Sequence, residues 1–542
     1  MPVEEDAYRY AVKNAALHEG RADAGAVAGK LKALHPQLDM RKLLQIAAAA
    51  VEKVNAMQLP AIGAEFEKFE EQGYELKPKE KEDYLPALEW AAAGKEPVVT
   101  RFAPNPNAPF HLGNARAAII SKEFALRYKG KFILRFDDTD PKVKKPVANA
   151  LQLFKEDLEW LGCNTDETYF ASDRLEIYYQ HMRETLQKGA AYVCTCPVLE
   201  WRKKTKEKKA CDCRELDKKE QLNRFEKMLS HETKEGEAVL RIKTDLQHND
   251  PSIRDWWAAK VVDNPVHPNP KAVDKHVWPS YNFASAVDDH LLGVTLILRG
   301  QEHAQNKTKQ EFLYKYFGWQ YPHCFHFGRV SLQGVVLSKS KMREGIESGK
   351  YLGWDDPRLG TIKAFKRRGF RPEVLREAIL DLGVNPNDAT IQWSKLVDLN
   401  RKLVEPLSER LAFIAEPMQL EVSYAPKGMD RLIVDKRQFD KLKEGDIVRL
   451  RELFNIRINR KDPLQTFSEF VGEAKINKPI MSWFRQGIDV EILMDDASKL
   501  LGLADAALAE KEAGAPMLLD GLGFCVVDKI EHGKVLLRFT HK

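Results

Sequence analysis

The chain has 542 residues, too many for one hydrophobic core, so we expect roughly three to five domains. Lys and Arg number 85 against 80 Asp and Glu, and the net charge of +5 is too small to indicate nucleic-acid binding by itself. No stretch approaches the ~20 apolar residues that span a bilayer, so we expect no membrane association. The acidic start, MPVEEDAYRY, lacks the pattern of a secretory signal, and the cytoplasm is the expected location.

The first part of the chain shows apolar residues at helical spacing, as in VAGKLKAL and RKLLQIAAAAVEKVNAM. The pattern predicts a small helical domain. The segment from Lys77 to Pro97 is charged and contains Pro and Gly, which indicates a surface connection. We assign residues 1–96 to this domain and its linker.

From Val98 onward, strand-like and helix-like runs alternate. An apolar run ends in TRFAPNP, a helix is expected from about Gly113 to Lys129, and KFILRFDD predicts the next strand. After an interruption the alternation resumes with SYNFASAVDDHLLGVTLILRG. This pattern predicts an α/β fold with a parallel sheet and helices on its faces, in two segments at residues 97–190 and 279–338.

The interruption, residues 191–278, contains a cysteine cluster, a charged helix and the strand-like AVLRIK. Its four thiols, in Cys194-Thr-Cys196 and Cys211-Asp-Cys213, suit a tetrahedral zinc site. CxC pairs are less typical of zinc than CxxC, and reduced structural cysteines are the alternative. Between the pairs, six of the nine residues of WRKKTKEKK are Lys or Arg, which forms either a positive surface for phosphates or a solvated helix face.

The rest of the chain changes character near residue 400. Residues 339–400 read as helical, most clearly in LREAILDLG. Residues 401–542 contain short apolar runs such as QLEVSYAP, FCVVDKI and KVLLRFTHK, which predict an all-β region. We expect a helical stretch near Ala497 to Glu512 to interrupt it.

Two segments suit nucleotide phosphates. In RFAPNPNAPFHLGNARAA, a strand end and a Pro-rich turn lead to a helix start with His111 and Gly113, where free N–H groups and the imidazole can meet an anion. A single His before a Gly is more often an ordinary turn. In GVVLSKSKM we expect a hydrophobic strand and then a loop, with Lys339 and Lys341 as anion partners, or else a solvated basic loop.

Together these segments resemble the HIGH and KMSKS signatures of the class I aminoacyl-tRNA synthetases, as His111-Leu112-Gly113-Asn114 and Val336-Leu337-Ser338-Lys339-Ser340. The runs LRFDDTDP, YNFASAVDDHLLGVTLILRGQEH, WDDPRLGTI and RRGFRPEVLREAI are similar to the glutamyl and glutaminyl branch. The similarity covers nearly the whole chain and is weakest in the N-terminal domain. Asn114 departs from the signature, which has a second His there, but Asn can still donate and accept hydrogen bonds.

The resemblance implies a Rossmann-like catalytic domain with an inserted domain that binds the tRNA acceptor end, a helical connector and a β-barrel anticodon-binding region. It implies ATP-dependent ligation of L-glutamate to tRNA(Glu) through a glutamyl-adenylate, with Mg²⁺ as the counter-ion of ATP. The C-terminal β region resembles that of archaeal, eukaryotic and glutaminyl forms and favours the archaeal type. Archaeal relatives often charge tRNA(Gln) too, and that question stays open for this chain, which we expect to be a monomer.

By resemblance, His111 and Lys339 are the catalytic residues. The residues expected to bind ATP lie in the two signatures and the preceding turn: Pro104, Asn105, Pro106, His111, Gly113, Asn114, Ser338, Lys339, Ser340 and Lys341. Those expected to bind glutamate are Arg101 at a carboxylate, Asp137 at the α-amino group, Tyr281 in the pocket wall, and Ala103 and Arg299.

Arg299 is the residue that distinguishes glutamate from glutamine as the expected substrate. Glutamyl enzymes carry Arg in the RGxxH context, glutaminyl enzymes an uncharged residue, and a guanidinium pairs with a γ-carboxylate but not with a neutral amide. The alternative is that Arg299 merely pairs with Glu302 or another nearby acid. The rival functions are a glutaminyl-tRNA synthetase, against which Arg299 argues, and a decayed tRNA-binding protein, which Asn114 alone supports. An adenylyltransferase of the wider HIGH superfamily does not account for the insertion or the β region.

Overall fold

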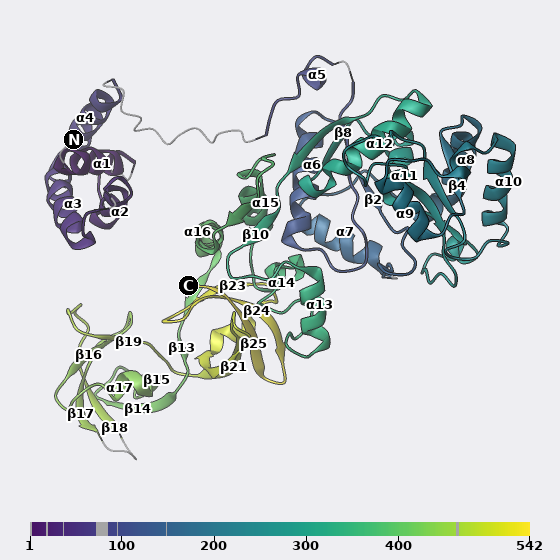
Figure 1. Ribbon diagram of the computed structural model, residues 1–542. Helices are drawn as coiled ribbons and strands as arrows, with labels where there is room; N and C mark the ends of the chain where they lie inside the picture. The colour runs from purple at the N-terminus through teal and green to yellow at the C-terminus, as the bar shows by residue number, and fades with distance from the viewer. Residues whose placement is uncertain are drawn as a thin grey trace. The chain divides into compact units, whose positions relative to one another are not determined.

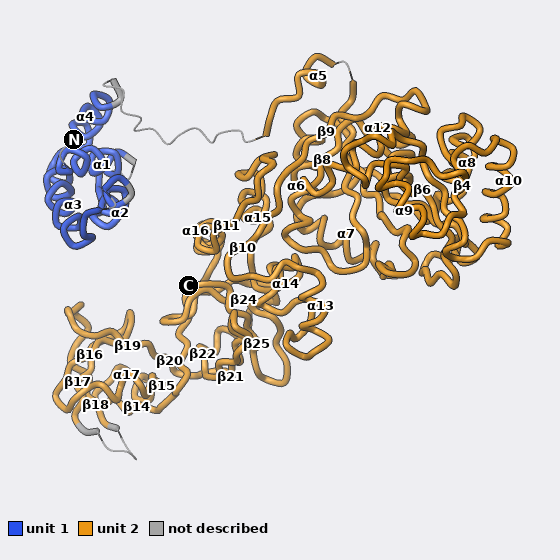
Figure 2. The backbone as a smooth tube through the Cα atoms, viewed as in Figure 1, with its two compact units in different colours: residues 1–83 blue, residues 84–542 orange. Residues whose placement is uncertain are grey.

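The computed structural model describes residues 3–17, 20–35, 37–71, 85–94, 96–147, 149–461 and 466–542. The chain divides into two compact units, residues 1–83 and 84–542 (Figure 2). Residues 77–84 and 95 of the predicted surface connection lie outside the described residues. None of the described helices is both long and apolar enough to cross a membrane.

In its described residues the first unit has four helices around one apolar core. Leu43, Ala47, Val51 and Val54 form one buried stripe of the third helix, as expected from the helical period. Asp23 and Asp39 cap two of the helices, each accepting a hydrogen bond from a backbone N–H of the first turn. The helices are α1 Val3–Leu17, α2 Ala24–Leu34, α3 Met40–Asn55 and α4 Leu59–Glu71.

The second unit contains a five-stranded parallel sheet, whose strands β2 and β8 are labelled in Figure 1. Its strands, in the spatial order β3-β2-β1-β8-β9, are β1 Val99–Phe102, β2 Lys131–Phe136, β3 Glu167–Phe170, β8 Leu296–Gly300 and β9 His323–Phe327. The chain builds outward from β1 to β3 on one side and from β8 to β9 on the other. The order therefore reverses between β1 and β8, and open α/β sheets bind ligands at the carboxyl ends of the strands at such a point. The predicted Rossmann-like fold is confirmed.

Helices pack around this sheet. α6 buries Leu112, Ala115, Ile119 and Phe124 in the core that it shares with the sheet. The helices around the sheet are α5 Glu89–Ala92, α6 Leu112–Arg127, α7 Ala150–Trp160, η1 Ala171–Arg174, α8 Leu175–Gln187, α11 Tyr281–Leu291, η4 Gln301–His303 and α12 Ala304–Phe317.

An inserted unit lies between α8 and α11. Its four antiparallel strands are β4 Ala191–Cys194, β5 Val239–Ile242, β6 Trp257–Val261 and β7 Val277–Pro279. Its helices are α9 Val198–Lys206, η2 Asp212–Glu215, α10 Lys218–Leu229 and η3 Pro270–Ala272. The cysteine pairs lie at the end of β4 and at the start of η2.

A helical connector follows the parallel sheet. It contains α13 Lys339–Glu347, α14 Ile362–Arg367, α15 Pro372–Leu380, α16 Trp393–Val404 and η5 Glu405–Leu407, with the short parallel pair β10 Val330–Leu332 and β11 Ala389–Ile391.

The C-terminal region forms two seven-stranded sheets. The first contains β12 Glu409–Leu411, β13 Phe413–Ile414, β21 Gly487–Leu493, β22 Lys499–Asp505, β23 Pro516–Leu519, β24 Gly523–Glu531 and β25 Lys534–His541. The second contains β14 Pro417–Ser423, β15 Arg431–Asp435, β16 Ile447–Leu450, β17 Asn455–Lys461, β18 Thr466–Gly472, β19 Ile480–Met481 and β20 Trp483–Phe484, and the short α17 Lys436–Phe439 lies between β15 and β16.

Both sheets curl into nearly closed barrels. β12 and β13 are the opposite edges of the first sheet, yet only Ala412 separates them in the chain. β19 and β20 are the opposite edges of the second, with only Ser482 between them. Since one residue spans only about 3.5 Å, the two edges of each sheet must nearly meet. The predicted C-terminal β-barrel architecture is confirmed.

Two local predictions were wrong. The helical stretch expected near Ala497 to Glu512 is instead the strand β22 followed by the short helix η6 Ala506–Glu510. All seven residues of β22 pair with β21, so cross-strand pairing overrides the helical spacing of the leucines. In GVVLSKSKM, residues 335–338 form no strand beyond a single bridge between Val336 and Leu359, and the expected loop is the first turn of α13, which begins at Lys339.

Candidate active site

A cavity of about 850 Å³ lies at the carboxyl ends of β1, β2 and β8, where the strand order reverses. It gathers most of the residues that the sequence singles out: Arg101, Ala103, Pro104, Asn105, His111, Gly113, Asn114, Asp137, Tyr281, Arg299, Ser338 and Lys339. Three others do not line it. Ser340 and Lys341 are exposed on α13, and Pro106 lines a smaller neighbouring cavity.

His111 is the N-cap of α6. Its Nδ1 accepts a hydrogen bond from the Gly113 backbone N–H at 3.1 Å. Burial, reinforced by the positive charge of Lys339, lowers the pKa of His111 to about 3. The imidazole is therefore neutral near pH 7, and because Nδ1 is an acceptor, Nε2 carries the proton and can donate to an anion.

Lys339 begins α13 and lines the same cavity. Burial, together with the nearby positive charges of Lys144 and Arg343, lowers the pKa of its ammonium to about 8. Lys144 also lines the cavity. Mutual repulsion between these cations makes an anionic ligand favourable here.

Arg101 is buried on β1 and is neutralised by an acid on α11. Its Nε and Nη2 donate to the Asp289 carboxylate at 2.9 and 3.1 Å. Burial opposes the charge on Arg101, but Asp289 more than compensates and raises the pKa. The pair thus remains ionised.

Asp137 follows β2 and is held by its backbone. The Asp137 backbone N–H donates to the Pro104 carbonyl at 2.8 Å. The side-chain amide of Asn105 donates to the backbone carbonyl of Asp137 at 2.9 Å. Burial raises the pKa of its carboxyl, whereas Arg135, whose Nη1 lies 3.6 Å from Oδ1, lowers it.

Four oxygens that line this cavity are buried and accept no hydrogen bond from any described residue. They belong to Asn105, Asn114, Asp137 and Asn282, and each is an Oδ1 atom. Buried acceptors without donors are costly unless a ligand supplies N–H or O–H groups. The cavity therefore suits a ligand with ammonium, amino or hydroxyl groups as well as anionic groups.

Arg299, on β8, is only 5% exposed. Its guanidinium donates to Gln310 Oε1 at 3.1 Å, to the Tyr321 hydroxyl at 3.0 Å and to His326 Nε2 at 3.4 Å. Within the described ranges it forms no ion pair with Glu302 or any other acid, and Glu302 instead lies 4.0 Å from Arg329. A buried guanidinium with only uncharged partners favours an anionic ligand.

The four predicted metal ligands form one cluster. The sulfurs of Cys194, Cys196, Cys211 and Cys213 all lie within 4.8 Å of one another. Cys194 and Cys211 are 3.9 Å apart, and Cys196 and Cys213 are 3.8 Å apart. Sulfurs about 2.3 Å from a tetrahedral metal would be separated by roughly 3.8 Å, so the cluster fits such an ion.

Sequence reasoning gave no role to several residues of the site. Asp288 accepts hydrogen bonds from Arg135, Arg174 and Tyr178, and Asp289 neutralises Arg101. The rings of His303 and Tyr281 are tilted against each other with their centroids 5.6 Å apart. Burial, and after it the charge of Arg299, lowers the pKa of His303 to about 4. For the two aspartates the signal was present in YNFASAVDDHL, because adjacent acids that follow the mostly apolar run FASAV in a helix indicate buried ion pairs.

Known proteins similar to this chain point to one family. Residues 97–406 match the family model described as the catalytic domain of class I tRNA synthetases (E and Q). The glutamate–tRNA ligases of Pyrococcus furiosus and Thermococcus kodakarensis are 46% and 44% identical to this chain over 577 and 575 aligned positions, and that of Methanothermobacter thermautotrophicus is 40% identical over 567. Each alignment covers 100% of both chains. The crystal structure of a glutamate tRNA ligase from Elizabethkingia meningosepticum, in complex with its amino acid, is 22% identical with a TM-score of 0.43 and covers 58% of this chain and 70% of that chain.

Proposed function

The chain belongs to the glutamyl and glutaminyl class I tRNA synthetases, and from this premise we propose how its residues join L-glutamate to tRNA(Glu). The activity is glutamate–tRNA ligation with ATP. Glutamate attacks the α-phosphate of ATP to form a glutamyl-adenylate and release pyrophosphate. A terminal ribose hydroxyl of the tRNA then attacks the activated carbonyl and releases AMP.

Arg299 selects glutamate, and its lack of an acidic partner is the observation that carries this assignment. A γ-carboxylate would supply the missing negative charge. A γ-amide would leave the guanidinium uncompensated in a desolvated pocket, which costs several kcal/mol. The glutaminyl alternative is disfavoured for this reason.

Asp137 binds the α-ammonium group of glutamate, and Arg101 binds a carboxylate of the same substrate. Asp137 Oδ1 lines the cavity without a hydrogen-bond donor, and an α-ammonium offers three. Arg101 uses Nε and Nη2 for Asp289, so Nη1 is the nitrogen available for a substrate carboxylate oxygen. The Tyr281 ring closes the pocket wall beside His303.

His111 and Lys339 stabilise the charge that develops on the phosphates. The neutral His111 donates through Nε2, and the Lys339 ammonium faces the same cavity. Preorganised donors of this kind act on the transition state without rearrangement, and each contributes about 100 to 1,000-fold in rate. Mg²⁺ bound to ATP supplies further neutralisation of the phosphate charge.

The cysteine cluster holds a structural zinc ion. The four-sulfur donor set and its separations support this, since a site closed by four thiolates leaves no position for substrate. The metal would fix the end of β4 to η2, on either side of the basic helix α9. The purified protein should contain about one zinc per chain, and Cys211→Ser should lower both the metal content and the melting temperature. Full charging activity and unchanged stability without any metal would contradict the assignment.

The tRNA contacts follow the division of the chain. We assign the acceptor end to residues 191–278 and the anticodon to residues 401–542. Where the two barrels close, a cavity of about 690 Å³ is lined by Trp483, Arg485 and Gln486, among others. An aromatic ring with Arg and Gln side chains suits splayed-out bases. Contacts in this cavity would also decide whether tRNA(Gln) is charged. We propose that the enzyme acts as a monomer, because a single chain supplies the active-site cavity and this cavity.

Charging of purified tRNA(Glu) and tRNA(Gln) with labelled glutamate and labelled glutamine tests this function. We expect charging with glutamate only. Glutamine charging would overturn the role of Arg299, and the absence of any charging would favour a decayed tRNA-binding protein. Comparison of the two tRNAs shows how strictly the anticodon is read.

A further inference from the structure

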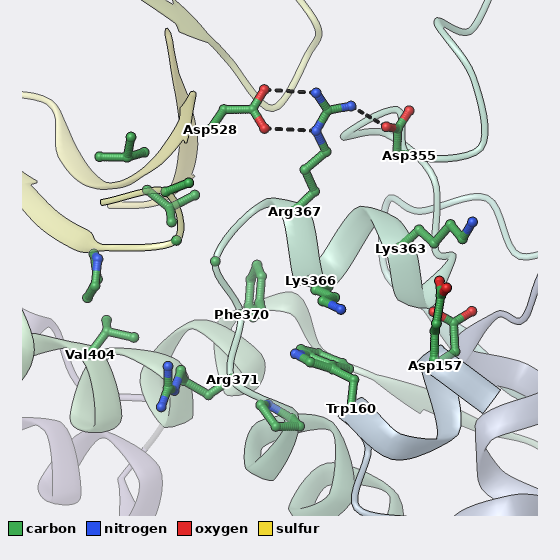
Figure 3. A pocket seen from close by; sticks show the side chains of 18 residues that line it. Asp157, Trp160, Asp355, Lys363, Lys366, Arg367, Phe370, Arg371, Val404 and Asp528 are labelled. Atoms are coloured by element: carbon green, nitrogen blue, oxygen red, sulfur yellow. Dashed lines mark hydrogen bonds and ion pairs between the residues drawn. The ribbon is translucent and has the colours of Figure 1, made fainter. Parts of the chain in front are cut away.

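A second cavity, of about 580 Å³, shares no lining residue with the active-site cavity. Three parts of the second unit build it: α7 from the parallel sheet domain, α14 and the loop after it from the connector, and β24 from the first barrel (Figure 3). Its volume is typical of sites for small organic ligands.

Asp157, on α7, is the most unusual side chain of this cavity. It is 3% exposed, and its Oδ2 atom has no hydrogen-bond partner among the described residues. Burial raises the pKa of the carboxyl to about 7, although Lys363 and Lys366 oppose the shift. Near neutral pH the carboxyl can therefore either donate or accept a hydrogen bond, and a ligand with paired donor and acceptor groups would satisfy it.

Trp160 lies one helical turn beyond Asp157 on the same helix and is half-buried. No other ring stacks on it in the part of the chain that the structure describes, whereas Phe370 already packs against Phe365, Trp393 and His541. The remaining walls include the apolar side chains of Val404, Pro516, Val526 and Val527. An indole on which no described ring stacks, together with apolar walls, suits a flat ring.

Positive charge surrounds this flat space. Lys366 and Arg371 are exposed and Lys363 is half-buried, and none of the three forms an ion pair with a described acid. Arg367 differs, because its guanidinium is held between Asp528, at 2.9 Å from both Nε and Nη2, and Asp355 (Figure 3). The Arg367–Asp528 ion pair links the connector to the barrel. Lys363, Lys366 and Arg371 therefore remain to bind a ligand.

We propose that this cavity binds a purine nucleotide, with the ring on Trp160, its hydrogen-bonding edge at Asp157 and its phosphate at Lys366 and Arg371. Inorganic phosphate would use only the cations, and an amino acid would leave the indole face bare. A purine presents adjacent donors and acceptors on its edge, as the Asp157 carboxyl requires. The nucleotide is either free in solution or part of a bound tRNA.

Binding of labelled AMP tests the proposal once the active site is filled. A non-hydrolysable glutamyl-adenylate analogue should occupy the active site, and loss of glutamate charging verifies the block. Equilibrium dialysis should then find one saturable AMP site per chain. Asp157→Leu, which removes the hydrogen-bonding edge, and Lys366→Met, a change at an exposed residue, should each weaken AMP about tenfold. Lys155→Met, on the same helix but outside the cavity, is the matched control and should leave AMP binding unchanged.

The source of the nucleotide is distinguished by tRNA(Glu). If the cavity takes a nucleotide of the tRNA, added tRNA(Glu) displaces AMP, and Lys366→Met weakens tRNA binding about tenfold relative to Lys155→Met. If it takes a free nucleotide, AMP and tRNA bind together and the variants leave tRNA affinity unchanged. The proposal is overturned if the blocked enzyme binds no AMP and the variants bind tRNA normally, or if both cavity variants bind AMP as tightly as the wild type does.

Discussion

The strands β1 and β8 each carry one buried arginine near their carboxyl ends, but only the arginine of β1 has an acidic partner among the described residues. Arg101 on β1 is 3% exposed and has a carboxylate partner in Asp289. Arg299 on β8 is 5% exposed and has only uncharged partners in the described structure. The fold neutralises the first charge itself and leaves the second to the ligand. A buried charge without a counter-ion therefore marks where the substrate's opposite charge belongs.

Breaking the neutralised pair should have the largest effect. Asp289→Asn leaves Arg101 buried and uncompensated, and we expect the free energy of unfolding to fall by about 3 to 5 kcal/mol. Denaturant unfolding measures this change. Asp274→Asn, at an exposed position, should stay within about 0.5 kcal/mol of the wild type. A loss below about 1 kcal/mol for Asp289→Asn would mean that the pair is unimportant for stability.

Lys339 is a second cation that the fold leaves to a ligand, and its removal sharpens the comparison. Lys339→Met should lower the charging rate about 100 to 1,000-fold, because the phosphates lose a preorganised donor. Unfolding should be nearly unaffected, since no buried partner is left unpaired. Steady-state charging and thermal unfolding of the same preparations distinguish this result from a general loss of folding.

The pH dependence tests the same cation without changing its size. Since burial lowers the pKa of Lys339 to about 8, the ammonium is charged below that pH and is lost as the pH rises through it. The kcat/KM for ATP should therefore fall above about pH 8. Lys339→Arg should abolish this alkaline decline, because a guanidinium stays charged. A decline that persists in the variant would have another origin.

Replacement of Lys144 should have the smallest effect, which is a shift of the pH profile. Its charge lowers the pKa of Lys339, so Lys144→Met should raise that pKa and move the alkaline decline to higher pH. The shift is measured from kcat/KM for ATP against pH. A shift toward lower pH, or none, would show that Lys144 does not act on Lys339 through charge.

The sequence predicted well what is local and poorly what depends on distant pairing. The HLGN turn and the KSKM segment were each ambiguous alone, but the parallel sheet brings His111 and Lys339 to one cavity. The partner of Arg101 lies 188 residues away, and no local pattern could pair it with Asp289. Residues 499–505 form a strand because β21 pairs along all of them, although their leucines fit a helical period. Closure of the barrels likewise depends on strands that meet across the whole region.

The specificity of Arg299→Gln tests the central claim most directly. Charging of tRNA(Glu) gives kcat/KM for glutamate and for glutamine in the wild type and the variant. We expect the variant to lose roughly 100-fold or more with glutamate while its weak use of glutamine stays the same or rises. An equal loss with both amino acids, or retention of the wild-type preference, would contradict the account, because the guanidinium would then not be the group that reads the γ-carboxylate.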